Sequence, residues 1–287
     1  MHSFYQEVLN DEIGSGISLY SATPIGGGCI HNGTKLVTSK GNFFLKWNNS
    51  STPDMFEKEA EGLNLLSSVG IFTIPRPISF GKLEGKYFLL MEYIESSAKI
   101  GGYWSDFGQK LALLHQKTEG RFGLDHDNYI GSLPQYNKHQ KSWGEFFVKM
   151  RIQPQLDIAI KNRLADHSLM EALDKLYQKI PEILPNEKPS LLHGDLWSGN
   201  VMTDSEGKVC LIDPAVYYGH REIELAFTTL FGGFNSKFYH SYDEAFPRSP
   251  GFMERIDLYN IYPLLVHLNL FGSSYYGSVM RSIMRYI

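Results

Sequence analysis

Three polar side chains near the middle of the chain have the types and spacing needed to transfer a phosphoryl group to a hydroxyl. Asp195 and Asn200 lie five positions apart in HGDLWSGN, and Asp213 ends the hydrophobic run VCLI. Such a transfer needs an acceptor for the hydroxyl proton and hard oxygen ligands for Mg²⁺. We expect Asp195 to be the acceptor and Asn200 and Asp213 to supply the ligands.

A lysine and a glutamate in the first third of the chain predict how the phosphates would be held. Strand alternation in FFLKW places Lys46 on the same face as Phe44. Glu59 falls within an apolar helical stripe that begins at Phe56. A buried carboxylate needs a cation, so we expect Glu59 to pair with Lys46, as in protein-kinase-like enzymes. The alternative is that Lys46 reaches solvent at a strand edge and Glu59 lies at the edge of its helix.

A run of glycines, Gly26, Gly27 and Gly28, lies between two predicted strands. It is either ordinary turn chemistry or a loop whose backbone N–H groups approach nucleotide phosphates. The Walker pattern and the dinucleotide-binding pattern are both missing. Together with the lysine, the glutamate and the three polar residues, in this order, the run indicates an ATP-dependent hydroxyl kinase.

The elements that must position these residues follow from hydrophobic periodicity. Residues from about Ile17 to Tyr93 read as strands interrupted by one helix, which Thr52, as the cap, and Pro53, at the first helical position, are expected to start. The expected strands and helix are Ile30–Val37, Asn42–Trp47, the pair Ile78–Phe80 and Tyr87–Tyr93 with its turn at 83–85, and the helix from Met55 to about Ser67.

The pattern becomes helical after Glu95, as in Phe107, Leu111, Leu114 and then Leu156, Ile160, Leu164. We therefore expect an α+β fold of two lobes. A small antiparallel-sheet lobe with one key helix, residues 1–94, would bind the nucleotide. A larger, mostly helical lobe, residues 95–287, would hold the catalytic and acceptor-binding residues.

Composition limits the possible functions. The 287 residues are 43% hydrophobic and 20% charged, which is typical of a soluble enzyme. The formal net charge of −4 gives no basis for nucleic-acid binding. We expect no signal peptide, no membrane span and, with two cysteines, no disulfide framework. The expected location is therefore cytoplasmic.

The chain resembles the fructosamine kinases (ketosamine 3-kinases), which are similar to aminoglycoside and choline kinases. The resemblance extends over almost the whole chain apart from residues 1–16. The segments that carry it are GGGCI, FFLKWN, MFEKEAEGL, FGLDHDNYIGSLPQYN, HGDLWSGN, IDPAVYYGHRE, ELAFTTLFGGF and LVHLNLFG.

The resemblance implies a protein-kinase-like fold and ATP-dependent phosphorylation of the 3-hydroxyl of ketosamines. The acceptors would be fructosamines, ribulosamines or erythrulosamines, free or on protein lysines, and the unstable product would release the amine and so deglycate it. Two alternatives stay open: an aminoglycoside- or choline-type kinase, and a non-catalytic ATP-binding module.

Three departures argue against protein kinase activity. Gly194 stands where protein kinases carry arginine, and Pro214 and Ala215 follow the metal aspartate in place of Phe-Gly. The Ala-Pro-Glu motif is also missing from the segment that follows. These differences suit a small-molecule kinase that needs no activation-loop phosphorylation.

Further residues have candidate roles, some of them with an alternative. The backbone of Glu92, Tyr93 and Ile94 is expected to meet adenine. His193 is expected to brace the catalytic loop, and the alternative is that it contributes to the active site. Trp197 would stack on the sugar or amine, or pack in the core. Tyr217, His220 and Arg221 are candidates for the acceptor pocket, although Arg221 would equally pair with Glu222 or Glu224.

Cys29 follows the glycine run directly. Neighbouring N–H groups and Lys46 would favour its thiolate and hence its oxidation. The resemblance implies redox control through an intermolecular disulfide, so we expect a monomer or a redox-linked homodimer. The alternative is an inert thiol that fits the turn. Cys210, in a buried run, is a poor internal partner.

Overall fold

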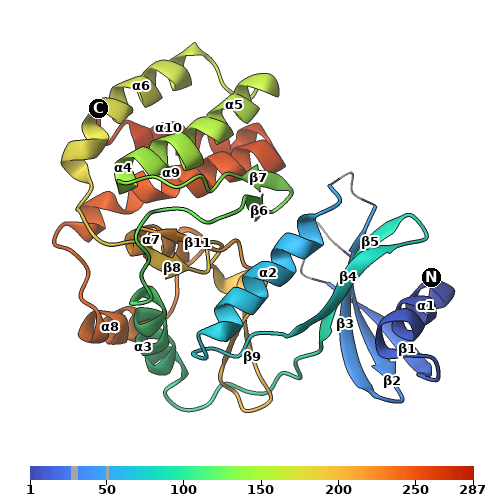
Figure 1. Cartoon of the computed structure of the whole chain (residues 1–287). Helices are drawn as coiled ribbons and strands as arrows, with labels where there is room; N and C mark the ends of the chain where they lie inside the picture. Colours follow the sequence, from blue (N-terminus) through green and yellow to red (C-terminus); the bar gives the residue numbers. More distant parts are fainter. Residues whose placement is uncertain (27–31, 50–51) are drawn as a thin grey trace. The chain divides into compact units, whose positions relative to one another are not determined.

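The computed structural model describes residues 1–26, 32–49 and 52–287 (Figure 1). Its contacts divide the chain into two compact units, Met1–Tyr103 with Gly199–Pro214, and Trp104–Ser198 with Ala215–Ile287. The segment 199–214 belongs to the first unit because its backbone hydrogen-bonds there: Ser97 N–H donates to Asp204 O, and Leu211 N–H donates to Thr73 O. The expected division into a nucleotide-binding lobe, residues 1–94, and a catalytic and acceptor-binding lobe, residues 95–287, concerns function and stays a prediction.

The predicted antiparallel sheet forms the first unit's framework, and it has five strands. The predicted turn at 83–85 is present, and both Glu84 and Gly85 have positive φ, as tight hairpins that match strand twist require. Across the sheet the strands run in the order β1 Leu19–Ile25, β2 Asn32–Thr38, β3 Gly41–Asn48, β5 Lys86–Glu92 and β4 Pro77–Leu83.

A helix that the sequence analysis did not predict, α1 His2–Ile13, packs on this sheet. Its apolar residues recur at i, i+1, i+4 and i+5, and Phe4, Val8 and Leu9 are completely buried against strand residues such as Leu45. This periodicity was visible in residues 1–16, which had been given no role. Helix α1 thereby covers one face of the sheet, so polar side chains that could act on a ligand in this unit must lie on the other face.

Helix α2, Met55–Ser68, occupies nearly the predicted range. Its expected start was wrong in detail: the N-cap residue is Asp54 rather than Thr52, and Pro53 precedes the helix instead of opening it. Phe56, Ala60 and Leu63 are buried, as the helical stripe predicted. Figure 1 shows α2 running beside β4, with which it is in contact.

A short hairpin completes the first unit and carries two of the candidate site residues. Strands β9, Val201–Thr203, and β10, Val209–Leu211, pair antiparallel. Asn200 directly precedes β9 and Asp213 follows β10, so pairing brings the two ends of the hairpin together. Cys210, within β10, is completely buried.

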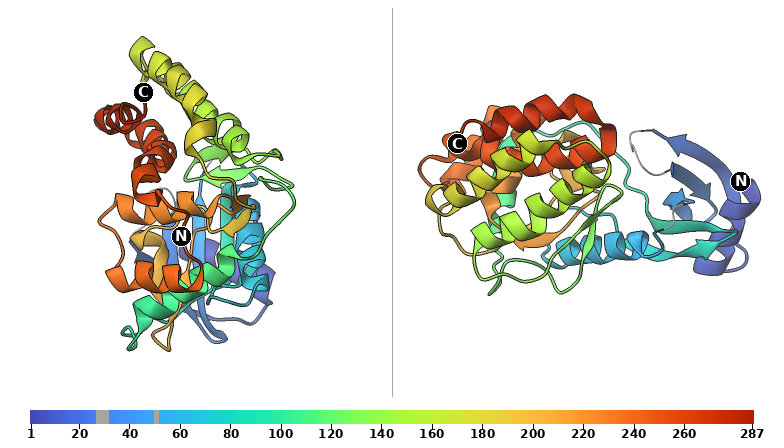
Figure 2. Two further views of the ribbon diagram at one scale, coloured as in Figure 1. Left: turned by 90° about the vertical axis from the view of Figure 1, so that its left-hand side faces the viewer. Right: turned by 90° about the horizontal axis from the view of Figure 1, so that it is seen from above.

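Helices dominate the second unit. Phe107, Leu111 and Leu114 are buried in α3, as predicted, but Ile160 is exposed and Leu164 lies beyond the end of α5. The long helix α9 lies against α5, α7 and α10, as the views in Figure 2 show. The helices are α3 Tyr103–His115, α4 Trp143–Phe146, the π-helical turn Phe147–Ile152, α5 Gln153–Lys161, α6 His167–Ile183, α7 Arg221–Leu230, α8 Ser236–Ala245, α9 Phe252–Phe271 and α10 Tyr276–Ile283.

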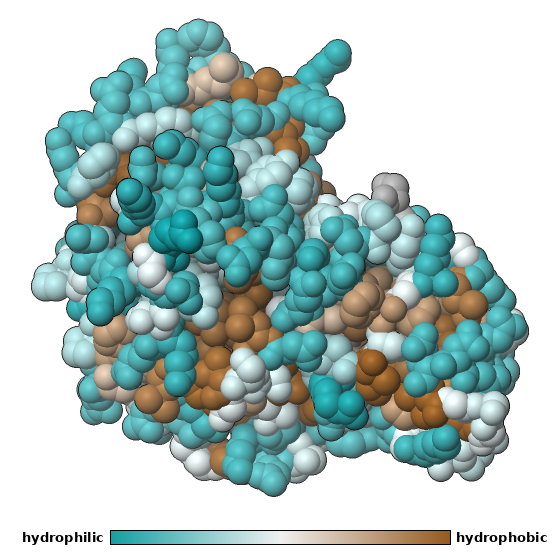
Figure 3. All heavy atoms as spheres, in the orientation of Figure 1, coloured by the Kyte–Doolittle hydropathy of each residue, from teal (hydrophilic) through white to brown (hydrophobic). Residues whose placement is uncertain are grey.

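Two small sheets place the segment that carries Asp195 in this unit. Strand β8, Ser190–Leu192, pairs antiparallel with β11, Tyr217–Gly219, while β6, Asn128–Ile130, pairs with β7, Leu133–Gln135. None of the helices in the described ranges is long and apolar enough to cross a bilayer. Hydrophilic side chains cover much of the face seen in Figure 3.

Candidate active site

The predicted ion pair between Lys46 and Glu59 is present in the first unit. Lys46 Nζ lies 2.6 Å from Glu59 Oε1 and 2.5 Å from Asp213 Oδ1. The Lys46 side chain is only 8% exposed and that of Glu59 12% exposed, which excludes the solvent-facing alternative. One cation thus joins strand β3, helix α2 and the segment after β10.

The electrostatics keep this lysine charged. Burial by itself lowers the pKa of Lys46, but the carboxylates of Asp213 and Glu59 outweigh burial and raise that pKa above its ordinary value. Burial raises the pKa of Glu59, with the attraction of Lys46 opposing it. Lys46 is therefore a fixed positive charge whose partner Asp213 is 40% exposed on its side chain, and a phosphate could share that charge.

Asn200 and Asp213 lie close together in the same unit because the hairpin between them closes. The Ile212 N–H donates to Asn200 O at 3.1 Å, next to the last β9–β10 pair. Their donor set of one carboxylate and one carboxamide suits Mg²⁺, which takes few protein oxygens and completes its octahedron with waters and phosphates. No cluster of three or more His, Cys, Asp or Glu side chains with metal-ligand geometry occurs among the described residues. The chemistry of this pair therefore fits a magnesium ion held jointly with a nucleotide.

The segment His193-Gly194-Asp195, which carries the predicted base, is held in the second unit by its own backbone. Ala215 N–H donates to His193 O at 2.9 Å, and Asp195 N–H donates to His193 Nδ1 at 3.3 Å. Gly194 has φ of +85°, and a Cβ there would meet Ala215 O at 1.9 Å. No side chain fits this site, which explains the glycine where protein kinases have arginine. His193 braces the loop, as predicted.

Glu224, on α7, holds the same segment through hydrogen bonds from its backbone. Its carboxylate accepts the N–H of Gly194 at 2.7 Å and that of His193 at 3.2 Å. It also lies 2.9 Å from Nε2 of His115, whose Nδ1 is 2.8 Å from the Tyr242 hydroxyl. All of these side chains are buried. From the sequence, Glu224 is a candidate only as a partner for Arg221, so its role in holding the loop was not predicted.

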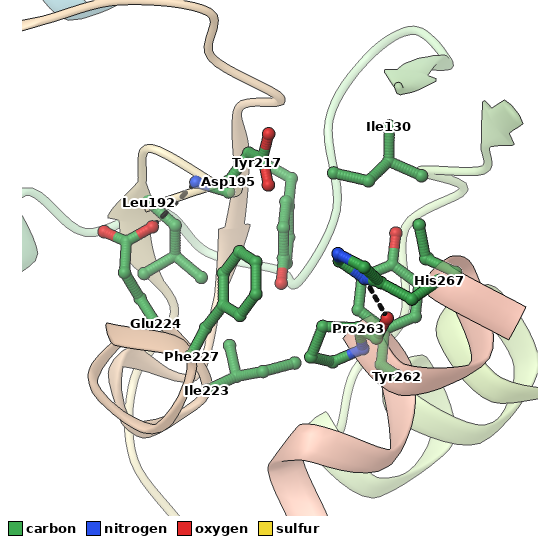
Figure 4. Close-up of a pocket in the computed structure, with 12 residues that line it drawn as sticks. Ile130, Leu192, Asp195, Tyr217, Ile223, Glu224, Phe227, Tyr262, Pro263 and His267 are labelled. Carbon is green, nitrogen blue, oxygen red and sulfur yellow. Dashed lines mark hydrogen bonds between the residues drawn. The ribbon is translucent and has the colours of Figure 1, made fainter. Parts of the chain in front are cut away.

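A pocket opens beside Asp195 within the second unit, with about 410 Å³ of space not filled by protein atoms, part of it open to solvent. Figure 4 shows the Tyr217 ring standing in the middle of its wall. The Arg151 guanidinium lies 3.8 Å from the centre of that ring and fixes it. Most of the lining is apolar or aromatic: Ile130, Leu192, Ile223, Phe227, Pro263 and Val266, with Tyr217 and Tyr262.

The four candidate acceptor residues are in different situations. Tyr217 lines the pocket, and the half-buried Trp197 packs edge-on against Phe231 at 6.1 Å between ring centroids. His220 is completely buried and caps α7 by accepting the Glu222 N–H. Arg221 is also buried. Neither His220 nor Arg221 is among the residues that line the described pocket.

The expected partners of Arg221 were wrong. Arg221 pairs with Glu187, with Nε 2.8 Å from Oε2, whereas Glu222 pairs with Arg255 and Glu224 with His115. Residues at i+1 on a helix point in different directions, so Glu222 was never within easy reach of Arg221.

The remaining predicted nucleotide contacts are only partly described. Gly26 directly follows β1 and is exposed, while Gly27, Gly28 and Cys29 lie outside the described residues. Strand β5 ends at Glu92, whose N–H donates to Arg76 O at 3.0 Å. The adenine prediction therefore rests on other backbone groups of residues 92–94.

Phe227, Tyr262 and His267 also line the pocket and were not predicted as site residues. Phe227 and His267 lie in ELAFTTLFGGF and LVHLNLFG, which had been noted as characteristic segments without a role. That grouping of aromatic and histidine residues was the available signal.

Comparison with known proteins places this site in context. The model of the family described as fructosamine kinase matches residues 1–287. The chloroplastic protein-ribulosamine 3-kinase of Oryza sativa subsp. indica is 39% identical over 279 residues, which cover 96% of this chain and 81% of the relative.

Solved structures agree with the fold prediction. The crystal structure of a protein assigned as a fructosamine-3-kinase from Haemophilus somnus 129PT has a TM-score of 0.88 at 30% identity, covering 100% of this chain and 98% of that one. Aminoglycoside phosphotransferase APH(4)-Ia has a TM-score of 0.63 at 15% identity, with both chains covered completely. The second likeness concerns the fold alone, and it confirms the protein-kinase-like architecture.

Proposed function

The chain belongs to the fructosamine kinase family, and on that premise we propose that it transfers a phosphoryl group from ATP to the 3-hydroxyl of ketosamines, free or on protein lysines. As a member of this family it is an ATP-dependent phosphotransferase with an alcohol group as acceptor. The family model and the rice relative are described by different sugars, fructosamine and ribulosamine, so the shared chemistry is that of a ketosamine.

One observation carries the division of roles: a buried lysine is shared by the helix carboxylate Glu59 and by Asp213. Lys46 would contact the phosphates of ATP, and Glu59 would hold the lysine in place. The glycine run and the backbone of residues 92–94 are the proposed remaining contacts of the nucleotide.

Asn200 and Asp213 are the proposed ligands of Mg²⁺. When bound, the metal neutralises the charge that develops on the transferred phosphoryl group. Asp213 has the exposure and the charge for this task, and its ion pair with Lys46 keeps its carboxylate oriented. Both ligands come from one short hairpin, so their spacing is set locally.

Asp195 is the proposed catalytic base. The oxygen of the 3-hydroxyl forms the new bond to the γ-phosphorus, its proton passes to the Asp195 carboxylate, and ADP leaves with the bridging oxygen. The backbone of Asp195 is held by His193, and the N–H of Gly194 before it by Glu224. The ketosamine 3-phosphate would then decompose with release of the amine, which repairs the glycated group.

A panel of acceptors tests this function. ADP release is measured side by side with ribuloselysine, fructoselysine, choline and an aminoglycoside as substrates. We expect turnover with one or both ketosamines and none with the other two. Turnover with choline or the aminoglycoside alone would assign the chain to a different acceptor class, and nucleotide binding without any turnover would make it a non-catalytic module.

The Asp195→Asn variant tests the base. Turnover should fall by about 10²–10⁴-fold, which is the usual worth of a positioned general base, while binding of Mg-ATP should stay nearly unchanged. Asp125→Asn, which removes an exposed carboxylate from the same unit, is the matched control. Retention of most of the wild-type turnover in Asp195→Asn would remove Asp195 from this role.

A further inference from the structure

The orientation of His267, on α9, shows which of its ring nitrogens can accept a hydrogen bond. Nδ1 lies 2.7 Å from Pro263 O, and because a carbonyl oxygen can only accept, Nδ1 must carry the hydrogen. Burial lowers the pKa of this imidazole, which keeps it neutral near pH 7. Nε2 therefore holds a lone pair.

That lone pair faces the pocket. Figure 4 shows the second ring nitrogen of His267 directed toward Tyr217 and the pocket interior. Within the described ranges, Nε2 makes no hydrogen bond, although the ring is fixed by packing on Phe231 at 4.7 Å and on Tyr275 at 5.2 Å between centroids. Nε2 of the neutral His267 ring is thus an oriented hydrogen-bond acceptor in a mostly apolar wall, and a ligand bound there should supply the donor.

The pocket has the character of a site for a cation that carries N–H groups. Its lining includes the Asp195 carboxylate, the acceptor Nε2 of His267, and the aromatic rings of Tyr217 and Phe227. It contains no lysine or arginine side chain among its lining residues. Carboxylates and aromatic faces both favour ammonium groups.

We propose that His267 accepts a hydrogen bond from the protonated amine of the ketosamine, and that it thereby selects ketosamines over the parent ketoses. This inference rests on the proposed function. In a ketosamine the amine is attached to C1, and only C2 separates C1 from the carbon that bears the reacting hydroxyl. A substrate with its 3-hydroxyl at Asp195 therefore carries its amine within the same pocket. The apolar lining beyond His267 then receives the hydrocarbon chain attached to the nitrogen.

Sugar hydroxyls other than the reacting one would be poorer occupants of the apolar part of this pocket. Each sugar hydroxyl needs a donor or an acceptor when it leaves water, and the apolar side chains of the wall, Phe227, Val266, Pro263 and Ile223, supply none. The protonated amine needs only one strong acceptor, and the nearby Asp195 carboxylate compensates its charge. His267 is thus a specificity-determining residue, and the reaction itself does not require it.

A matched pair of substrates and a matched pair of variants test this role. The substrates are a 1-deoxy-1-(methylamino)ketose and the corresponding 1-O-methylketose, in which an ether oxygen replaces the amine and removes the donor. His267→Phe keeps an aromatic ring for packing but removes the acceptor, and His267→Gln restores an acceptor oxygen near the position of Nε2. Melting temperatures identify any variant whose folding is impaired.

For wild type we expect a clear preference for the amine. His267→Phe should lower kcat/KM for the amine by about 10- to 100-fold, chiefly through KM, since hydrogen bonds to charged groups contribute roughly 1.5–3 kcal/mol. Its kcat/KM for the ether should fall far less, and His267→Gln should recover most of the preference.

Two results would overturn the inference. An equal loss for both substrates in His267→Phe would mean that the ring acts by packing or contacts the sugar. A wild-type preference that survives in a stable His267→Phe protein would place amine recognition elsewhere. Failure of the wild type to phosphorylate any ketosamine would instead reject the proposed function, and the amine-binding role with it.

Discussion

Nε2 of His115 lies 2.9 Å from the carboxylate of Glu224, and both side chains are fully buried. Burial by itself would raise the pKa of Glu224, but the hydrogen bond and charge of His115, together with the N–H of Gly194, lower that pKa below its ordinary value. Glu224 is therefore a carboxylate at neutral pH, and it holds the backbone beside the proposed catalytic base.

Glu224→Gln should lower kcat by about 10- to 100-fold, because a catalytic group misplaced by about 1 Å loses rate on that scale. The new NH₂ group would face backbone N–H donors and leave a buried donor unpaired, at a cost of roughly 1–3 kcal/mol in stability. Steady-state kinetics and thermal unfolding measure the two effects. Glu222→Gln is the matched control: Glu222 lies on the same helix as Glu224, and its loss breaks a buried ion pair with Arg255 of α9 without touching the loop. It should lower stability and spare kcat; an equal loss of kcat in both variants would show that Glu224 acts only through overall stability.

Lys46→Met should strongly reduce kcat/KM for ATP, and Glu59→Ala should reduce it less. The double variant should be little worse than Lys46→Met, because Glu59 acts by placing the lysine. A double-mutant cycle on kcat/KM, with unfolding measured in parallel, determines the coupling. Additive effects would mean that the two residues work independently.

The ion pair between Glu187 and Arg221 should make a pH-dependent contribution to the free energy of unfolding. Burial opposes ionisation of Glu187, but the hydrogen bond from Arg221, the proximity of His220 and the bond from Ser249 together lower its pKa from 4.5 to about 2. A carboxyl whose pKa is lower in the folded state stabilises the fold above its unfolded pKa and loses that contribution as pH falls toward its folded pKa.

Glu187→Gln should therefore be less stable than wild type by about 2–3 kcal/mol at pH 7, and the gap should shrink to less than about half at pH 3. Denaturant unfolding at several pH values measures this gap. Glu182→Gln, on the exposed side of α6, should show no comparable gap. A gap that stays constant down to pH 3 would mean that packing, rather than charge, stabilises this contact.

Cys210 should not react with thiol reagents in the native protein. Burial above all, then the charges of Asp204 and Glu92, raise the pKa of its thiol to about 12, so almost no thiolate exists near pH 7. In a Cys29→Ala variant, a maleimide should label no thiol until the chain is unfolded. Labelling of the folded variant would contradict the burial of β10.

The redox prediction for Cys29 comes from the sequence alone, because this residue lies outside the described ranges. Peroxide should lower activity and produce a covalent dimer that reductant reverses, and Cys29→Ala should abolish both effects. Non-reducing gels with parallel activity assays decide the matter. Full activity under peroxide without a thiol-sensitive dimer would rule out the switch.

The sequence by itself determined the parts of this protein that depend on local order. Strand alternation and the cost of burying a carboxylate were sufficient to predict that Lys46 and Glu59 pair. The antiparallel sheet and helix α2 followed from periodicity and turn residues, whereas the start of α2 was placed wrongly, the first strand was given no bounds and α1 was omitted. The motif HGDLWSGN and the segments around it were sufficient to identify the family.

Tertiary structure decided the contacts between residues that no period connects. Arg221 pairs with Glu187, 34 positions away, rather than with the acids near it on α7. Glu222, at i+1, points in a different direction, and the carboxylate of Glu224 is taken by His115 and the Gly194 N–H. Glu224 reaches back 30 positions to the Gly194 N–H, and His115 joins it from α3. His267 becomes a pocket residue only because its Nδ1 is held by Pro263 and its ring is packed against Phe231, which leaves Nε2 toward the interior. Such contacts depend on how helices pack in three dimensions. The spacing of residues along the chain does not reveal that packing.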